Sequence, residues 1–170
     1  MNPITTIPCC ATLLLASAIA AAGNYEVRQQ SIYETAAKVC QGALPQFAGT
    51  LRARPLALGN EGSTPAFATC GWEGMPRLEG GYGRDLKLVR ALLGNPTLSD
   101  LSFSCTIVKS PSAPVYYTRP VMIAAGGTAE VDLSQADLDE DQYLDYTQIS
   151  CELPPGAVIH ALLTIYDEEV

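Results

Sequence analysis

The sequence predicts a mainly β protein, an antiparallel β-sandwich or jelly-roll-like single domain with at most one short N-terminal helix. Three observations support this class. Apolar and polar residues alternate with a period of two in several segments, glycine and proline turns separate these segments, and no long helical pattern lies between them. Roughly seven or eight short strands with this spacing are typical of two packed antiparallel sheets.

The clearest strand covers residues 101–107. Its apolar face consists of Leu101, Phe103, Cys105 and Ile107, and Ser102, Ser104 and Thr106 face the other way. Residues 146–153 and 158–166 alternate in the same manner, and Pro154-Pro155-Gly156 turns the chain between them. Such alternation predicts sheets that place one side on a core.

Two further pairs of segments carry hairpin signals. Residues 116–125 and 128–133 flank Gly126-Gly127, which predicts a compact hairpin. An alternating segment at 50–58 is followed by turn residues, and residues 65–72 are predicted to return beside it.

Two segments leave the element type open. Residues 86–93 suit either a strand or two helical turns. In residues 24–41, Ser31 and Glu34 have the spacing of a capping box, whereas Ile32 and Tyr33 suit a strand equally well. We expect a short helix or an irregular lead-in there.

Residues 1–22 have the features of a cleavable signal peptide. No charged side chain occurs in them, and the apolar run at 11–22 ends in small residues that fit the A-x-A cleavage pattern. A run of about 12 residues is too short to cross a hydrocarbon core of roughly 30 Å. The alternative, a buried helix, fits less well because the run is apolar on every side. We expect removal of 1–22 and a single β-rich domain at 23–170, periplasmic or secreted and not membrane-embedded.

The cysteines of the mature chain predict disulfides. Four remain after residue 22, namely Cys40, Cys70, Cys105 and Cys151. An even count in an exported chain indicates disulfide bonds, and four cysteines allow three pairings. We favour Cys40–Cys70 with Cys105–Cys151, because each half of the chain then has its own crosslink. A zinc site is disfavoured, since no C-x-x-C pair exists and the only histidine, His160, is distant from three of the cysteines.

Two groups of short motifs carry a resemblance. One group is Arg54-Pro55-Leu56-Ala57, Asn60-Glu61-Gly62, Ala66-Phe67 and Thr69-Cys70, and the other is Cys151-Glu152-Leu153-Pro154-Pro155-Gly156. Together they resemble small uncharacterised exported proteins of Gram-negative bacteria that contain disulfides and form β-sandwiches. The resemblance implies localisation and fold and brings no known activity.

Charge and the scarcity of catalytic residue types narrow the function. The net charge of −8 repels nucleic acids and anionic membranes and would steer a basic partner toward the protein. His160 lies in an apolar strand, and no G-x-S-x-G motif supplies a nucleophilic serine. Hydrolysis by paired carboxylates remains possible in principle, but no spacing singles out a pair.

Two groups of residues are candidate ligand contacts. Asp137, Asp139 and Asp141 alternate as calcium-loop ligands do, with Asp145 as a later ligand, although the glycine and the bidentate glutamate of an EF-hand are missing. The alternative is a solvated acidic turn, and no other cofactor is expected. Four aromatic residues at predicted strand ends or loops could stack on sugars or anchor an interface: Trp72, Tyr82, Tyr116 and Tyr117. Trp72 could instead pack on the disulfide at Cys70.

These observations favour a non-enzymatic periplasmic or secreted domain that binds a protein or a glycan. One alternative is a hydrolase that acts on cell-wall or extracellular polymers through paired carboxylates. Others are an inhibitor of a basic wall-degrading enzyme and a structural or assembly subunit.

Overall fold

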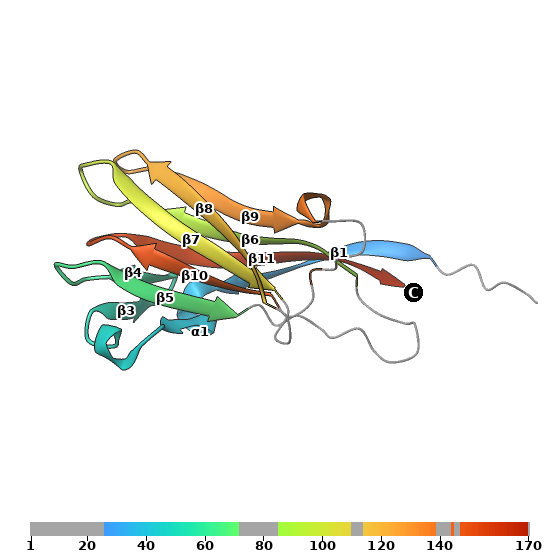
Figure 1. The fold of residues 1–170 in the computed structure, drawn as a ribbon, viewed down its shortest axis with the longest axis horizontal. Coiled ribbons are helices and arrows are strands. Elements are labelled where there is room, and N and C mark those ends of the chain that lie inside the picture. Colours follow the sequence, from blue (N-terminus) through green and yellow to red (C-terminus); the bar gives the residue numbers. More distant parts are fainter. Residues whose placement is uncertain (1–25, 72–84, 110–113, 139–143, 145–146, 170) are drawn as a thin grey trace, which may run out of the picture.

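The protein is a β-sandwich of two antiparallel sheets (Figure 1). The computed structural model describes residues 26–71, 85–109, 114–138, 144 and 147–169. The predicted fold class is therefore confirmed, including the single short helix, α1 (Ala36–Val39).

The six-stranded sheet, here sheet A, has the order β3-β4-β11-β6-β9, and β1 pairs with β11. Its strands are β1 (Val27–Thr35), β3 (Leu51–Arg54), β4 (Ala57–Asn60), β6 (Asp85–Gly94), β9 (Thr128–Ser134) and β11 (Val158–Glu169). One edge of β11 pairs with β6, and the other pairs first with β4 and then with β1. The last strand of the chain is thus the central strand of sheet A.

The five-stranded sheet, here sheet B, has the order β2-β5-β10-β7-β8. Its strands are β2 (Cys40–Gly42), β5 (Ala66–Gly71), β7 (Leu101–Lys109), β8 (Val115–Ile123) and β10 (Gln148–Leu153). Two 3-10 turns, Pro45–Phe47 and Gln135–Asp137, complete the regular structure.

The core lies between the two sheets and is formed by the inward residues of both. The largest fully buried apolar side chains are Phe103, Leu93, Ile107, Leu133, Leu144, Ile149, Leu153, Ile159, Leu162, Val89 and Val131. In β7, Phe103, Cys105 and Ile107 are buried while the intervening residues are more exposed, as the alternation predicts. Residues 86–93, open between strand and helix in the sequence, lie in β6.

The prediction for residues 24–41 was wrong for its first half. Residues 27–35 form a strand that pairs with β11 along its whole length. The capping-box spacing from Ser31 is not used, and the helix that follows is a single turn whose N-cap, Thr35, makes no side-chain cap bond. Pairing with β11 satisfies the backbone groups on one edge of this strand, which explains why the local helix signal does not prevail.

The hairpin predicted at Gly126-Gly127 was also wrong. The tight turn exists, with Gly126 at φ 70° and the Gly127 N–H bonded to the Ala124 carbonyl. It connects β8 of sheet B to β9 of sheet A, so the two flanking strands belong to different sheets. A short glycine turn reverses the chain in either case, and the pairing is decided by distant strands.

The segment at 50–58 folds differently from the single predicted strand. It forms the hairpin β3–β4, which turns at Pro55-Leu56, and Leu56 is exposed there. The predicted return beside it does not occur, because β5 pairs with β10 and β2 in sheet B. Proline at the turn ends the first strand by removing a ladder donor.

Candidate functional site

A shallow depression lies on the outer face of sheet A, the face turned away from sheet B. Its lining residues are Tyr33, Arg90, Leu92, Glu130, Ala161 and Leu163. They come from β1, β6, β9 and β11, so the whole width of this part of the sheet contributes.

The strand register explains why these residues meet. Tyr33 pairs with Leu163, Leu163 pairs with Arg90, and Arg90 pairs with Asp132. Directly opposed residues share a face of an antiparallel sheet, and neighbouring strands are about 4.8 Å apart. Tyr33 and Arg90 therefore flank Leu163 on the same face. In the adjacent row, Leu92 lies between Ala161 and Glu130.

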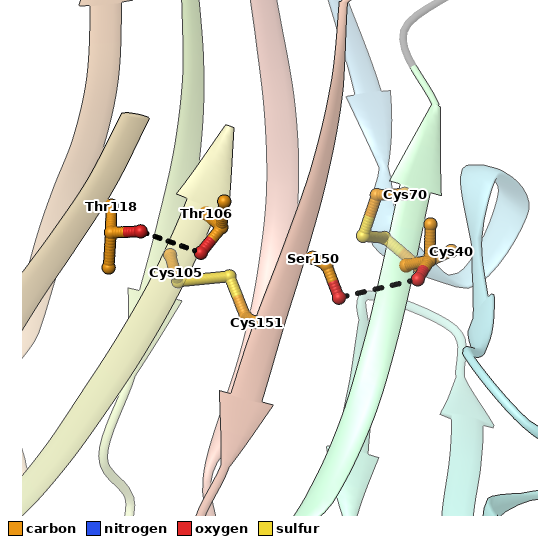
Figure 2. Close-up of a disulfide and its surroundings, with 8 residues drawn as sticks. Cys40, Cys70, Cys105, Thr106, Thr118, Ser150 and Cys151 are labelled. Atoms are coloured by element: carbon orange, nitrogen blue, oxygen red, sulfur yellow. Dashed lines mark hydrogen bonds between the residues drawn. A yellow bond between two sulfur atoms is a disulfide. The ribbon is translucent and has the colours of Figure 1, made fainter. Parts of the chain in front are cut away.

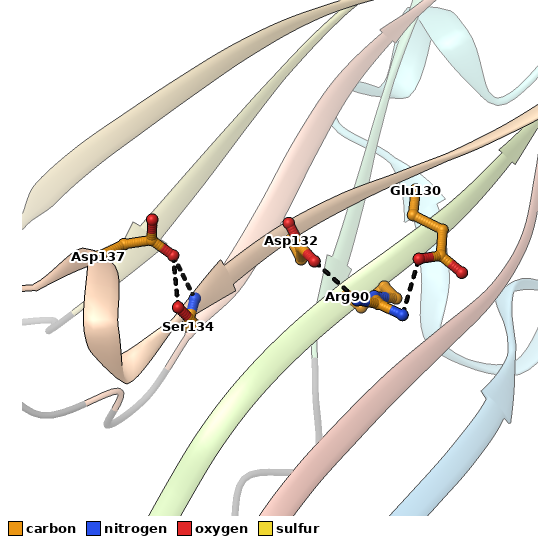
Figure 3. Close-up of polar contacts among 5 residues, drawn as sticks. All are labelled: Arg90, Glu130, Asp132, Ser134 and Asp137. Carbon is orange, nitrogen blue, oxygen red and sulfur yellow. Dashed lines mark hydrogen bonds and ion pairs between the residues drawn. The ribbon is translucent and has the colours of Figure 1, made fainter.

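Two carboxylates hold Arg90 in place (Figure 3). Its Nη1 lies 2.7 Å from Glu130 Oε2, and its Nη2 donates to Asp132 Oδ2 at 2.8 Å. Both carboxylates come from β9, two residues apart and on one face of that strand. The guanidinium is thereby fixed on the outer face of the sheet with both acceptors beside it.

The opposite side of the depression is apolar. Tyr33 has a relative exposure of 65%. Leu163 and Leu92 are half-buried and form the floor beside it. An exposed aromatic ring, an aliphatic floor and a fixed ion-paired group together suit an amphipathic ligand, with one apolar face and a rim of hydrogen-bonding groups.

The residues that line the depression include no histidine, cysteine or aliphatic hydroxyl. His160 lies elsewhere, with its imidazole against Gly94, where a Cβ would collide with the ring. The arrangement supplies contacts for a ligand, and its two carboxylates are both engaged by Arg90.

The outer face of sheet B has a different chemistry. Thr118, Thr106, Ser150 and Thr69 lie in one register row across four strands. The Thr106 and Thr118 hydroxyls are 3.1 Å apart, and Thr69 donates to Ser150 at 3.5 Å (Figure 2). This row consists of two hydrogen-bonded pairs of hydroxyl groups.

Two of the four predicted aromatic contacts lie within the described residues, and the structure does not bring them together. Tyr116 is 65% exposed on the outer face of sheet B. Its neighbour Tyr117 points the other way and packs against the core. Trp72 and Tyr82 lie outside the described residues.

The cysteines form the pairs that the sequence analysis favours, Cys40–Cys70 and Cys105–Cys151 (Figure 2). Each bond joins directly opposed residues of neighbouring strands, β2 with β5 and β7 with β10. Both crosslinks therefore lie within sheet B and fix its register, and neither joins sheet B to sheet A.

Asp137 serves as a capping residue. It accepts hydrogen bonds from the Ser134 N–H at 2.8 Å and from the Ser134 hydroxyl at 2.6 Å (Figure 3). These bonds, the hydroxyl one most strongly, lower its pKa below the ordinary value of 3.8; burial opposes the shift and Arg119 adds to it. Asp139, Asp141 and Asp145 lie outside the described residues, so the calcium site stays a prediction.

The sequence analysis missed Tyr33, Arg90, Glu130 and Asp132. The spacing of Glu130 and Asp132, two residues apart in a predicted strand, is a signal that places both side chains on one face. Tyr33 lay in a segment whose element type was open, and Arg90 was one of two basic residues, with Lys87, in the otherwise apolar segment 86–93. Their meeting depends on the order β1-β11-β6-β9, which joins distant segments.

Comparison with solved structures finds distant likenesses. The chain aligns with an exo-β-1,3-galactanase from Phanerochaete chrysosporium at TM-score 0.41 and 11% identity, covering 79% of this chain and 29% of that one. A protein described as CBM4 aligns at TM-score 0.37 and 10% identity, with 82% and 86% covered. A family 11 carbohydrate-binding module from Clostridium thermocellum aligns at TM-score 0.34 and 9% identity, with 89% and 91% covered.

No protein-family model and no curated protein matches the sequence. Among the described residues, none of the helical segments has the length and apolar character that a bilayer crossing requires.

Proposed function

We propose that this protein is a non-enzymatic binding domain that holds a glycan on the outer face of sheet A. The observation that carries the proposal is the row in which exposed Tyr33, Leu163 and ion-paired Arg90 lie side by side on three neighbouring strands. Sugar rings present an apolar C–H face and a rim of hydroxyl groups, and this row offers a surface for each.

The roles of the residues follow from their chemistry. Tyr33 stacks on the C–H face of a sugar ring, and the leucine floor extends that contact. Arg90 donates to ligand hydroxyl oxygens, and Glu130 accepts from ligand hydroxyl groups. Because Arg90 and Glu130 are already ion-paired with each other, little side-chain conformational freedom is lost when the ligand binds.

The charge of the site points to an uncharged glycan. Two carboxylates surround the single guanidinium, and the whole chain carries a net charge of −8. A polymer of acidic sugars would be repelled by both. A neutral polysaccharide meets no such penalty.

Glu130 and Asp132 are both ion-paired with Arg90, which supports binding over hydrolysis by a pair of free carboxylates. Export is part of the proposal: residues 1–22 are removed as a signal peptide, and residues 23–170 act in the periplasm or the medium. Two disulfides within sheet B support this, because such bonds persist in oxidising compartments.

Affinity electrophoresis against a panel of neutral and acidic polysaccharides tests the proposal, followed by calorimetry with the oligosaccharide of any glycan retained. Tyr33→Ala should weaken binding by about tenfold or more, because it removes the stacking ring. Tyr116→Ala is the matched control, since Tyr116 is as exposed as Tyr33, at 65%, but lies on sheet B.

Retention of a neutral glycan by the control variant but not by Tyr33→Ala is the expected result. Loss in Tyr116→Ala with full binding in Tyr33→Ala would move the site to sheet B and overturn the assignment. Retention of no neutral glycan by the native protein would overturn the function itself.

A further inference from the structure

Much of strand β1 is not covered by other described parts of the protein. Residues 27–31 are all exposed, so this part of β1 is open on both faces of the sheet. Within the described residues it pairs with β11 alone. Figure 1 shows β1 and the end of β11 extending beyond the strands of sheet B.

The outer edge of β1 has few of the features that usually prevent edge-to-edge pairing. Proteins protect edge strands with prolines, bulges, charged side chains or a short length, and β1 has two charged residues, Arg28 and Glu34. The nine residues of β1 contain no proline and no lysine, and the register with β11 runs without a shift from Val27 to Thr35. A long regular edge of this kind is a template for another strand.

We propose that β1 pairs antiparallel with β1 of a second copy, so that the two A sheets join into one continuous sheet. A two-fold axis perpendicular to the sheet relates the copies, which keeps each outer face on the same side and makes the contact isologous. Such an axis must pass between two copies of the same residue, because directly opposed residues of antiparallel strands point to the same face of the sheet. Only the register centred on Ser31 pairs all nine residues of β1.

This register is complementary in charge. It sets Arg28 of one copy opposite Glu34 of the other, twice per dimer. Glu34 is 7% exposed and its Oε1 accepts from Lys38, so in the dimer the guanidinium joins an existing ion pair at this carboxylate. Among the described residues of the monomer, Arg28 is ion-paired only with the exposed Glu26, at 3.1 Å, a surface pair that is exchanged at little cost.

In the proposed dimer, the ligand sites of the two copies lie on the same face of the joined sheet. Tyr33 of each copy lies opposite Gln29 of the other, so the two depressions face the same way across the joint. If both bind one polymer, the second contact is intramolecular and raises the apparent affinity. The dimer itself does not depend on the proposed glycan function.

The test places a charge on the two-fold axis. In Ser31→Lys the new lysine faces itself across the joint, and the dimer dissociation constant should rise by about fivefold or more through like-charge repulsion. Gln29→Lys is the matched control: it lies on the same face of the same strand, but opposite Tyr33, and should leave the dimer intact. Sedimentation equilibrium of the disulfide-bonded protein measures both constants.

A mixture of Ser31→Lys and Ser31→Glu should recover the association, because the axis then pairs opposite charges. Circular dichroism should be unchanged in all three variants, since residue 31 is exposed. A native protein that is monomeric at high micromolar concentration overturns the proposal. Equal weakening by Gln29→Lys and Ser31→Lys overturns the Ser31-centred register. Neither result depends on glycan binding.

Discussion

Asn60 and Asn95 make three corresponding hydrogen bonds at the ends of two strands of sheet A. Each Nδ2 donates to the carbonyl four residues later, at 2.9 and 2.7 Å, and each Oδ1 accepts from the N–H two residues later, at 2.9 and 3.0 Å. Each Nδ2 also donates to the last residue of a sheet B strand, Leu153 at 2.8 Å and Ile123 at 2.9 Å. The two amides thus fasten sheet A to sheet B, which the disulfides do not.

Replacing either asparagine with alanine should lower the free energy of unfolding by about 2–4 kcal/mol, because three side-chain hydrogen bonds are lost at Asn60 and five at Asn95, and buried backbone groups are left unpaired. Both side chains are 1% exposed, so water cannot readily replace the amide. Urea unfolding measures the change. Gln41→Ala, at an exposed position of sheet B, is the control and should stay within about 0.5 kcal/mol. A change of that small size in Asn60→Ala would contradict the fastening role.

The two disulfides should differ in their rate of reduction more than in their contribution to stability. They close loops of 30 and 46 residues, and on the chain-entropy model each contributes about 3–4 kcal/mol. Cys105 and Cys151 are both fully buried, whereas Cys40 is only partly buried. Mild reductant should therefore open Cys40–Cys70 first, since thiolate attack needs access to a sulfur. Alkylation with mass spectrometry over time checks the order, and simultaneous opening would contradict it.

Acid should weaken the turn after β9. The folded pKa of Asp137 is lowered, chiefly by the Ser134 hydroxyl, so its ionised form is favoured by folding. Its contribution to stability is fully present above the ordinary value of 3.8 and is lost as the pH falls through the lower folded pKa. Ser134→Ala should move the Asp137 carboxyl titration, followed by NMR, upward toward 3.8. It should also cost about 1 kcal/mol at neutral pH as a lost cap. An unmoved titration would show that the cap does not set the shift.

Arg90 should matter more for binding than for folding. Arg90→Met removes the donor that faces the ligand and leaves Glu130 and Asp132 without their shared cation. We expect glycan affinity to fall by about tenfold, whereas stability changes by less than about 1 kcal/mol because the ion pairs are partly exposed. Arg54→Met, which breaks the exposed pair with Glu61, is the control. Arg90→Lys should be intermediate, because an ammonium group cannot hold both carboxylates in a fixed plane. Equal binding by Arg90→Met and Arg54→Met would exclude Arg90 from the site.

The strands that alternate clearly were predictable from sequence because their pattern is set by burial of one face. Buried residues such as Phe103 and Ile149 show which face of their strand points to the core. Such a pattern does not show which strand lies beside it in the sheet. The glycine turn at residues 126–127 has the same local chemistry whether it joins two strands of one sheet or crosses between sheets.

The candidate site could not be predicted from the sequence for the same reason. Tyr33 and Arg90 are separated by more than fifty residues and meet only because β11 lies between their strands. The disulfide pairing was more accessible, since four cysteines allow few combinations and two of them lay in clear strands. A choice among a few cysteine pairings can be made from sequence, whereas the order of strands in a sheet depends on the packing of the whole chain.

The position of β11 has a consequence for the order of events during biogenesis. β1, β4 and β6 all bond to it, and the register joins Val27 to Glu169 at the two ends of the fold. A nascent chain that stops before Val158 lacks the central strand of sheet A, so β1 has no partner among the described strands and the pairs β3–β4 and β6–β9 are not yet joined. Such non-local topologies assemble in milliseconds to seconds rather than microseconds. Sheet A can therefore take its full strand order only after Val158–Glu169 has been synthesised.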